Sequence, residues 1–350
     1  MPLRWMTLAM LLLLTGMLAL AQAFLNPYYL SIIEFIGIYI ILTVSLNLTN
    51  GFTGLFSLGH PGFMAIGAYV ATLLTFPVAR KPLMLPNLPA WLAHIEIPFL
   101  PALITGGIAA SIAAVVIGFP VLRLRGHYLA LATLGFIIIM SNLITNLRDI
   151  TRGPLGINGI PAATTIWLVF GWAVITVYVC WRILNSSFGR ALLAIREDEV
   201  AASVMGIHLT KYKLFAFVTG AFFAGIAGGL WAHLVTAITP RTFWVPMAFN
   251  LVVMVVIGGS GSITGAIIGA AVMSVLAELL RPIETTLGLY GLIQLITATI
   301  LIVILIYRPE GIMGHNELNL AALVKVRSFG VSRSPSAPED AKEGENRRRT

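Results

Sequence analysis

Charged residues are scarce in this sequence of 350 residues. Asp, Glu, Lys and Arg together make up 10% of the chain, whereas hydrophobic residues make up 58%. Because a soluble globular protein is usually about one quarter charged, this composition excludes a soluble domain with one large core. The sequence instead indicates an integral membrane protein that crosses the bilayer many times.

Cysteine and cofactor-binding motifs are also lacking. The single cysteine, Cys180, excludes a disulfide bond within the chain. No stretch fits the GxxxxGKS/T pattern of an ATP-binding loop, and His, Cys and carboxylate residues do not cluster at metal-ligand spacing. We therefore expect this chain to bind no metal and no cofactor of its own.

The net charge of +8 does not indicate a nucleic-acid partner. The basic residues lie in short connecting segments and in the tail, without interleaved aromatic residues. Lysine and arginine are enriched in cytoplasmic loops of membrane proteins without any anionic ligand. With the N-terminus inside, the largest basic cluster, 182–213, falls on the cytoplasmic side, which predicts the orientation of the chain.

Ten apolar segments approach the length of about 20 residues that a helix needs to cross the hydrocarbon core of a bilayer. They lie near residues 6–24, 29–49, 55–78, 98–118, 128–147, 164–183, 213–237, 244–258, 263–282 and 287–307. We therefore predict an all-α integral membrane protein with about ten transmembrane helices.

The two ends of the chain differ from the middle. Residues 1–24 form a first transmembrane helix or signal-anchor, although residues 21–23 (AQA) also fit the cleavage site of a signal peptide. Residues 25–314 form the transmembrane domain. Residues 315–350 are polar and rich in Pro and Ser, so they bury too little apolar surface to fold, and we expect a disordered cytoplasmic tail.

A glycine-rich segment, TNGFTGLFSLGHPGFMAIGAY at 49–69, interrupts the apolar pattern. Irregular backbone at membrane depth occurs only where protein buries it or a water-filled cavity solvates it. The segment therefore either packs closely against neighbouring helices or lines the path of a solute. His60 likewise either contacts the solute or hydrogen-bonds a neighbouring helix. The pathway candidates in this region are Asn47, Asn50, Gly51, Gly54, Ser57, Gly59, His60 and Pro61.

A second glycine cluster, VIGGSGSITGAIIGA at 256–270, has a similar composition. It adds the pathway candidates Gly258, Gly259, Ser260 and Gly261. These four residues also match the GxSG pattern of rhomboid-type intramembrane serine proteases. That chemistry needs a histidine base on a later span, but the only later histidine, His315, follows the last span. The sequence therefore argues against a protease.

The segment 186–217 is the longest polar connection before the tail. It lacks proline and is rich in Ala, Leu, Arg and Glu, which predicts one helix over 189–205, with Gly206 as its natural end. An apolar stripe on this helix would fit the groove of a partner protein. The stripe consists of Leu193, Val200, Ala201 and Val204. The alternative is a helix lying on lipid headgroups, which the acidic run 197–199 disfavours because anionic lipids repel it.

Several motifs occur together in one order along the chain. They are GFTGLFSLGHPGFMAIGAYVATLL, TRGPLGINGIP, GRALLAIREDEVAASVMGIHLTKYKLFAFVTGAFFAGIAGGLWA, VVMVVIGGSGSITGAIIGA and LIVILIYRPEGIMG. As a set they resemble the permease subunits of branched-chain amino acid ABC importers, of the LivM-like type within the LivH/LivM family. The resemblance runs from about residue 30 to residue 314.

In such permeases a cytoplasmic loop docks on the ATPase, and the resemblance places that loop at 184–213. The residues implied in coupling are Gly189, Arg190, Arg196, Glu199, Ala201, Ala202 and Gly206. The family pattern Glu-Ala-Ala-xxx-Gly is met at Ala201, Ala202 and Gly206. Glu199 departs from it, because Val200 is inserted after the glutamate.

The resemblance also implies the partners of this chain. These are two cytoplasmic ABC ATPase subunits that use the ATP, a second homologous permease of the LivH-like type, and an extracytoplasmic solute-binding protein. The expected location is the bacterial inner membrane. The chain itself is then no enzyme but a permease subunit that moves branched-chain or related hydrophobic amino acids across the bilayer.

Two alternatives remain open at this point. The same type of permease also serves urea and short amides. A stand-alone ion-coupled transporter would need intramembrane ionisable groups, and the candidates are Glu34 and Glu278, both near the predicted outer face.

Overall fold

The fold is described from a computed structural model of the chain. The structure describes residues 3–124, 126–288, 291–308 and 311–314. Within these residues helices dominate, and the only sheet joins two strands of two residues each. The predicted tail, 315–350, lies outside the described residues, and so does His315.

The helices follow the predicted apolar segments in order. The α-helices are α1 (Leu3–Phe24), α2 (Pro27–Asn50), α3 (His60–Thr75), α4 (Lys81–Met84), α5 (Ala90–Ala93), α6 (Phe99–Val121), α7 (His127–Asn146), α8 (Arg148–Thr151), α9 (Ile166–Leu184), α10 (Ser187–Glu197), α11 (Glu199–Val204), α12 (Leu209–Val235), α13 (Val245–Gly258), α14 (Ile263–Leu287) and α15 (Leu292–Tyr307). The other elements are the 3-10 helices η1 (Gly153–Leu155) and η2 (Pro240–Phe243) and the strands β1 (Ile157–Asn158) and β2 (Ala237–Ile238).

Among the described residues, seven helices are long and apolar enough to cross a membrane. They are Pro27–Asn50, Phe99–Val121, His127–Asn146, Ile166–Leu184, Leu209–Val235, Pro240–Gly258 and Ile263–Leu287. Shorter apolar helices lie at Leu12–Phe24 and Leu292–Ile304, and α3 has 16 residues. Each of the ten predicted segments overlaps one of these helices, so the prediction of an all-α membrane protein is confirmed.

The predicted span 55–78 begins later than expected. Residues 51–59 are not helical, and α3 starts at His60. Gly54 has a φ of +73°, a left-handed conformation that ends regular helix geometry. Pro61 lies in the first turn of α3, where its missing N–H costs no hydrogen bond. The glycine-rich segment therefore connects α2 to α3 as irregular backbone.

Helix α12 lies at the centre of the helix packing and contacts α2, α3 and α6. Glycines bring the backbones of these helices into direct contact. A Cβ on Gly228 would lie 2.0 Å from the Met64 carbonyl oxygen, and one on Gly67 would lie 2.0 Å from the Gly225 carbonyl oxygen. Since lipid supplies no hydrophobic force between helices, such close contact is what holds a membrane bundle together.

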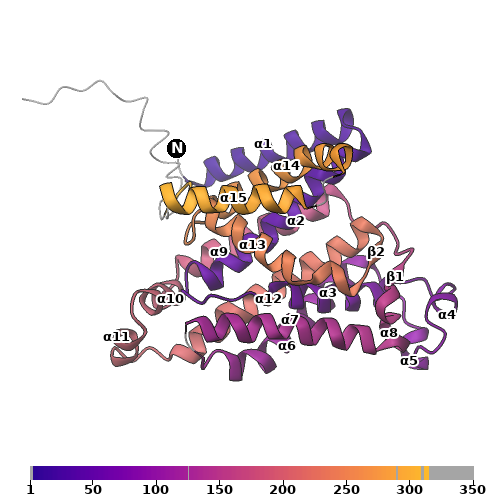
Figure 1. The fold of residues 1–350 in the computed structure, drawn as a ribbon, viewed down its shortest axis with the longest axis horizontal. Helices are drawn as coiled ribbons and strands as arrows, with labels where there is room; N and C mark the ends of the chain where they lie inside the picture. The colour runs from indigo at the N-terminus through magenta and orange to yellow at the C-terminus, as the bar shows by residue number, and fades with distance from the viewer. Residues whose placement is uncertain (1–2, 125, 289–290, 309–310, 315–350) are drawn as a thin grey trace, which may run out of the picture. The chain divides into compact units, whose positions relative to one another are not determined.

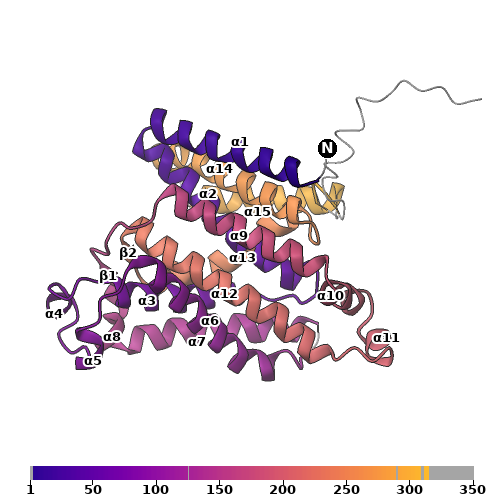
Figure 2. The ribbon, with the colours of Figure 1, turned by 180° about the vertical axis from the view of Figure 1, so that it is seen from behind.

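The short elements gather at two ends of the helices, as Figures 1 and 2 show. Helices α4, α5 and α8 lie with the β1–β2 pair at one end, the β end. Helices α10 and α11 lie at the other end, the α10 end. In the antiparallel strand pair, Ile157 faces Ile238 and Asn158 faces Ala237. The segment 182–213, predicted to be cytoplasmic, builds the α10 end.

We expect Gly228→Ala to destabilise the bundle by about 1–3 kcal/mol, because the new methyl group forces α3 and α12 apart. The melting temperature of the purified protein in detergent measures this loss. Gly171→Ala is the matched control, because nothing lies within 4 Å of a Cβ at that helical position. Equal melting temperatures for the two variants would contradict the backbone contact.

Candidate functional site

The end of α2 is joined to the turn that precedes α14. The side chain of Asn47 is fully buried. Its Oδ1 accepts a hydrogen bond from the Gly261 amide at 3.0 Å, and its Nδ2 donates one to the Ser262 carbonyl oxygen at 2.8 Å. One amide side chain therefore satisfies two backbone groups that lie more than 200 positions away in sequence. We call residues 47–59 together with 258–262 the junction.

At two glycines of the junction, neighbouring atoms leave no room for a side chain. A Cβ on Gly51 would lie 1.9 Å from Asn47 Oδ1 and 2.4 Å from the Gly261 nitrogen. A Cβ on Gly258 would lie 2.1 Å from the Gly265 carbonyl oxygen. The glycines thus allow α2, α13 and α14 to meet at the junction.

The loop 51–59 satisfies its polar groups within the protein. Asn50 Nδ2 donates to the Ser57 carbonyl oxygen at 3.0 Å, and Asn50 Oδ1 accepts from the Ser57 amide at 3.1 Å. The Leu58 amide donates to Thr133 Oγ1 of α7 at 2.9 Å. These bonds give backbone groups of Ser57 and Leu58 the partners that buried backbone requires. The loop is therefore fixed to both α2 and α7.

His60 is buried where α2, α3 and α12 meet. Its Nε2 lies 3.4 Å from Ser45 Oγ, within hydrogen-bond distance, and its ring faces Gly220, where a Cβ would lie 3.2 Å from His60 Cε1. Among the described residues, Nδ1 has no partner. The histidine thus contacts a neighbouring helix in this structure.

The segment 189–205 was predicted to be one helix, and this prediction is wrong. Helix α10 ends at Glu197, and α11 begins at Glu199. Asp198 lies between them in extended conformation, and its side chain accepts hydrogen bonds from the amides of Val200 at 2.7 Å and Ala201 at 3.0 Å. Aspartate is a strong N-cap residue, so it starts a new helix here rather than continuing the old one.

Helix α10 is bonded directly to the junction. Arg196 Nη1 donates to the Gly51 carbonyl oxygen at 3.1 Å. Its remaining guanidinium nitrogens bond Glu197 Oε1 at 3.1 and 3.3 Å. Gly54 lies against the same side chain, since a Cβ there would be 3.0 Å from Arg196 Cγ. A movement of α10 must therefore act on the loop between α2 and α3.

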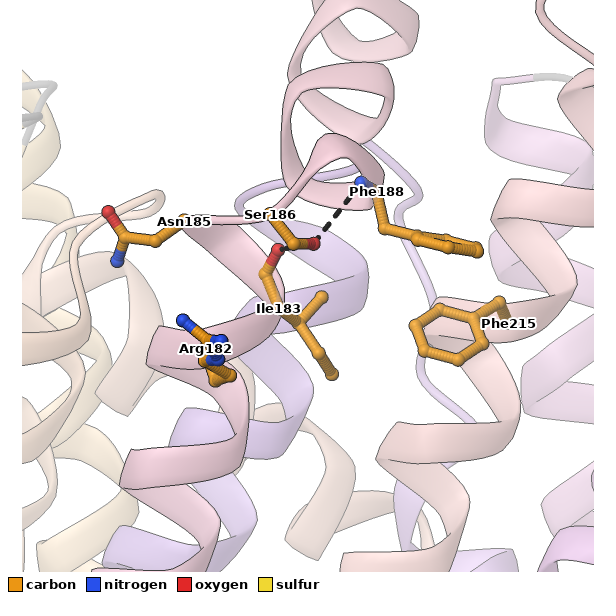
Figure 3. A pocket seen from close by; sticks show the side chains of 6 residues that line it. All are labelled: Arg182, Ile183, Asn185, Ser186, Phe188 and Phe215. Carbon is orange, nitrogen blue, oxygen red and sulfur yellow. Dashed lines mark hydrogen bonds between the residues drawn. The ribbon is translucent and has the colours of Figure 1, made fainter.

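The start of α10 is anchored on α12 beside a small pocket (Figure 3). Ser186 Oγ accepts a hydrogen bond from the Phe188 amide at 3.2 Å, and the Phe188 ring lies 5.0 Å from that of Phe215. Gly189 allows the close passage of α10 over α9, because a Cβ there would be 2.2 Å from the Leu184 carbonyl oxygen. The pocket measures about 360 Å³ and is lined by Arg182, Ile183, Asn185, Ser186, Phe188 and Phe215.

Helix α11 is tied to α12 by charge and leaves an apolar surface exposed. Glu199 forms an ion pair with the buried Lys213, and Ala202 is buried. Val204 and Met205, at the end of α11, are 81% and 82% exposed. Gly206 follows with a φ of +84° and ends the helix as predicted. The exposed surface at the end of α11 is therefore largely apolar, with Ser203 as an exposed polar residue beside it.

An open cavity of about 890 Å³ lies near the β end. Its walls come from α2, α7, α12, α13 and the segments around η1 and η2. It is lined by Tyr39, Ser141, Asn142, Thr145, Pro154, Trp231, Pro240, Arg241, Thr242, Trp244, Pro246, Met247 and Asn250. A cavity of this size is large enough for a small solute.

Comparison with known proteins identifies the family. A family model described as branched-chain amino acid transport system / permease component matches residues 28–307. This match runs from α2 to the end of α15. The chain belongs to this family.

Individual relatives agree with that assignment. The high-affinity branched-chain amino acid transport system permease protein LivM of Salmonella typhimurium is 34% identical over 310 residues, covering 79% of this chain and 68% of that protein. LivM of Escherichia coli gives the same identity and coverage. The permease protein LivH of Salmonella typhimurium is 25% identical over 296 residues, covering 80% of this chain and 92% of that protein.

One solved structure, PsaBC from Streptococcus pneumoniae in complex with Fab, is 14% identical to this permease. It covers 85% of this chain and 97% of its own, with a TM-score of 0.41.

In this permease the predicted pathway residues gather at the junction and not around the large cavity. Asn47 and Gly51 approach Gly261 there, and Asn50 bonds Ser57 of the same loop. Gly258 and Gly259 are buried, whereas Ser260 is exposed. Gly59, His60 and Pro61 are buried at the start of α3. Among the implied coupling residues, Arg190 and Ala201 are exposed and Gly189 and Ala202 are buried.

Sequence reasoning missed four residues that position these elements. Thr133, Asp198, Lys213 and Arg241 make the contacts or line the cavity described above. Only Asp198 carried a usable signal, because an aspartate directly before a helix-forming run is a typical N-cap.

We expect Asn47→Ala to weaken the junction, because the Gly261 amide and the Ser262 carbonyl then lose their buried partner. Amide hydrogen exchange of peptides that cover 256–265 should become at least about tenfold faster. Asn146→Ala is the control, since Asn146 bonds only its own helix at an exposed site. Unchanged exchange in Asn47→Ala would contradict the role of Asn47.

Proposed function

We propose that this chain is a permease subunit of an ATP-driven ABC importer that moves branched-chain or related hydrophobic amino acids across the bacterial inner membrane. The observation that carries the proposal is the family match, which covers all but the first of the predicted spans. The relatives named above are permeases of branched-chain amino acid transport systems. In this role the chain provides part of the path and performs no chemistry on the solute.

The energy for transport comes from partners. Two cytoplasmic ATPase subunits bind and hydrolyse the ATP, a second homologous permease of the LivH-like type completes the path, and an extracytoplasmic binding protein delivers the solute. Within the importer the α10 end faces the cytoplasm, as its basic residues favour, and the tail 315–350 is cytoplasmic.

The ATPase docks on α10 and α11. The exposed apolar surface of Val204 and Met205 fits a groove on a partner better than it fits water. Because Glu199 is bound to Lys213, it orients α11 on α12, and the apolar residues make the contact. Docking then biases the permease between two states, as a partner with different affinity for each state does.

The movement reaches the bundle through Arg196. This side chain is the link between α10 and the Gly51 carbonyl, and Gly51 belongs to the junction where α2, α13 and α14 meet. The glycine-rich segments 50–62 and 258–265 are accordingly the parts that move when the importer changes access from one side to the other.

The first test is transport by the reconstituted importer. We expect proteoliposomes with both permeases, the ATPases and the binding protein to take up L-leucine only when ATP is supplied. Urea and acetamide serve as competitor solutes. Uptake of urea in place of leucine would assign the importer to amides, and ATP-independent uptake by this chain alone would overturn the importer proposal.

We expect Val204→Asp to reduce binding of the ATPases, because it places a charge on the apolar docking surface. Co-purification of the ATPases with the tagged permease measures the effect. Leu83→Asp is the control, since Leu83 is also 81% exposed but lies at the β end. The docking assignment is wrong if both variants retain the ATPases equally.

We expect Arg196→Gln to separate docking from transport. Loss of a hydrogen bond from a charged donor, about 1.5–3 kcal/mol, corresponds to a fall in leucine uptake of at least about tenfold. ATPase binding should persist, because Arg196 faces the junction and not the docking surface. Arg80→Gln, at an exposed position at the β end, should leave uptake unchanged; an equal loss in both variants would contradict the link.

A further inference from the structure

The lining of the cavity at the β end combines one charged side chain with neutral polar side chains. Arg241 is the only charged residue among its described lining residues. The guanidinium makes no hydrogen bond or ion pair with the described part of the chain. The amide side chains of Asn142 and Asn250 lie in the same lining. The cavity therefore offers one positive charge and neutral hydrogen-bonding groups, and no carboxylate among the described lining residues neutralises that charge.

Other lining residues of the cavity are apolar and aromatic. Tyr39 of α2 and Trp231 of α12 meet edge to face, with ring centroids 5.8 Å apart. Trp244 and Met247 add apolar surface from the start of α13. Aromatic and thioether groups pack favourably against an aliphatic side chain.

The backbone holds Arg241 in place. Its 3-10 helix, η2, follows strand β2, which pairs with β1. Thr239 and Thr242 bond each other across this helix, with their hydroxyl oxygens 3.1 Å apart. Gly156 lets the chain pass β2 closely, because a Cβ there would lie 2.0 Å from the Ile238 carbonyl oxygen. Arg241 is therefore presented by a fixed element.

We propose that this cavity is an entry site for the solute and that Arg241 binds its carboxylate, while the aromatic wall receives an aliphatic side chain. Guanidinium and carboxylate match in charge and geometry. The proposal rests on the proposed function and adds to it a site and a means of selection. A solute with a carboxylate is held there, whereas urea and short amides lack the group that Arg241 recognises.

The volume adds a second expectation. A cavity of about 890 Å³ is much larger than an amino acid. One bound molecule therefore leaves much of the lining in contact with water. Binding is consequently weak and release is fast. Weak binding and fast release suit a site that the solute passes through, whereas the separate binding protein binds the solute tightly and selects it.

The first experiment measures the charge of the cavity without transport. A cysteine is introduced by Asn250→Cys in a Cys180→Ala background, because the native thiol is the only other one. Its modification rates with anionic sulfonatoethyl and cationic trimethylammonioethyl methanethiosulfonate are compared in the assembled importer. Adding Arg241→Gln should lower the anionic-to-cationic rate ratio about threefold or more. At Leu83→Cys, outside the cavity, Arg241→Gln should leave the ratio unchanged.

The second experiment tests the solute. ATP-driven L-leucine uptake should fall about tenfold in Arg241→Gln and be largely kept in Arg241→Lys, which retains the charge. Arg80→Gln, at an exposed site at the β end, should transport normally. An unchanged labelling ratio, or normal leucine uptake by Arg241→Gln, overturns the entry site.

Failure of the proposed function gives a different result. In that case the wild-type importer itself takes up no leucine with ATP, whichever residue occupies position 241. A wild-type importer that transports leucine while Arg241→Gln matches it leaves the function standing and rejects only the site.

Discussion

Buried irregular backbone is the constraint on which the arrangement of this permease depends. In a bilayer, each peptide group that leaves a helix must find a partner within the protein. Two segments that approach the end of α2 leave helix geometry, at 51–59 and at 259–262. Two asparagine side chains supply the partners: Asn47 bonds the second segment, and Asn50 bonds the first. Because both residues lie in the last turn of α2, that helix fixes both irregular segments.

This geometry joins three parts of the molecule that are far apart in sequence. The end of α2 meets the turn between α13 and α14 through Asn47, and it meets α10 through the Gly51 carbonyl. The opposite end is built differently, with a strand pair and a short helix that hold Arg241 beside an open cavity. The two ends thus differ in packing: backbones are in close contact at the junction, and an open cavity lies near the β end.

Hydrophobicity alone predicted most of the fold. The ten apolar segments correspond to helices because a span of about 20 apolar residues has no other way to satisfy its backbone in lipid. The error at 55–78 arose from counting the apolar residues of 55–59 as helix, although the helix begins only at His60, with Pro61 in its first turn. The error at Asp198 arose in the same way, since helix propensity was summed across a residue that caps.

The contacts within the site could not be predicted from the sequence, because they depend on how distant helices pack. Nothing in the residues around Asn47 indicates that its partner is Gly261, because the pairing depends on how α2 and α14 cross. No motif around Arg241 indicates a cavity, because its place depends on the pairing of β1 with β2. The glycine clusters were recognised as unusual, but packing and lining predict the same composition.

The link from α10 ends on a backbone atom, and this has an evolutionary consequence. A carbonyl oxygen is present whatever residue occupies position 51, so substitution on the loop side cannot remove the acceptor. Only a change at Arg196 removes the donor. Glycine at position 51 is required for a separate reason, because a Cβ there would lie 1.9 Å from Asn47 Oδ1. The connection therefore constrains two positions for different reasons: residue 51 by space and residue 196 by its hydrogen bond.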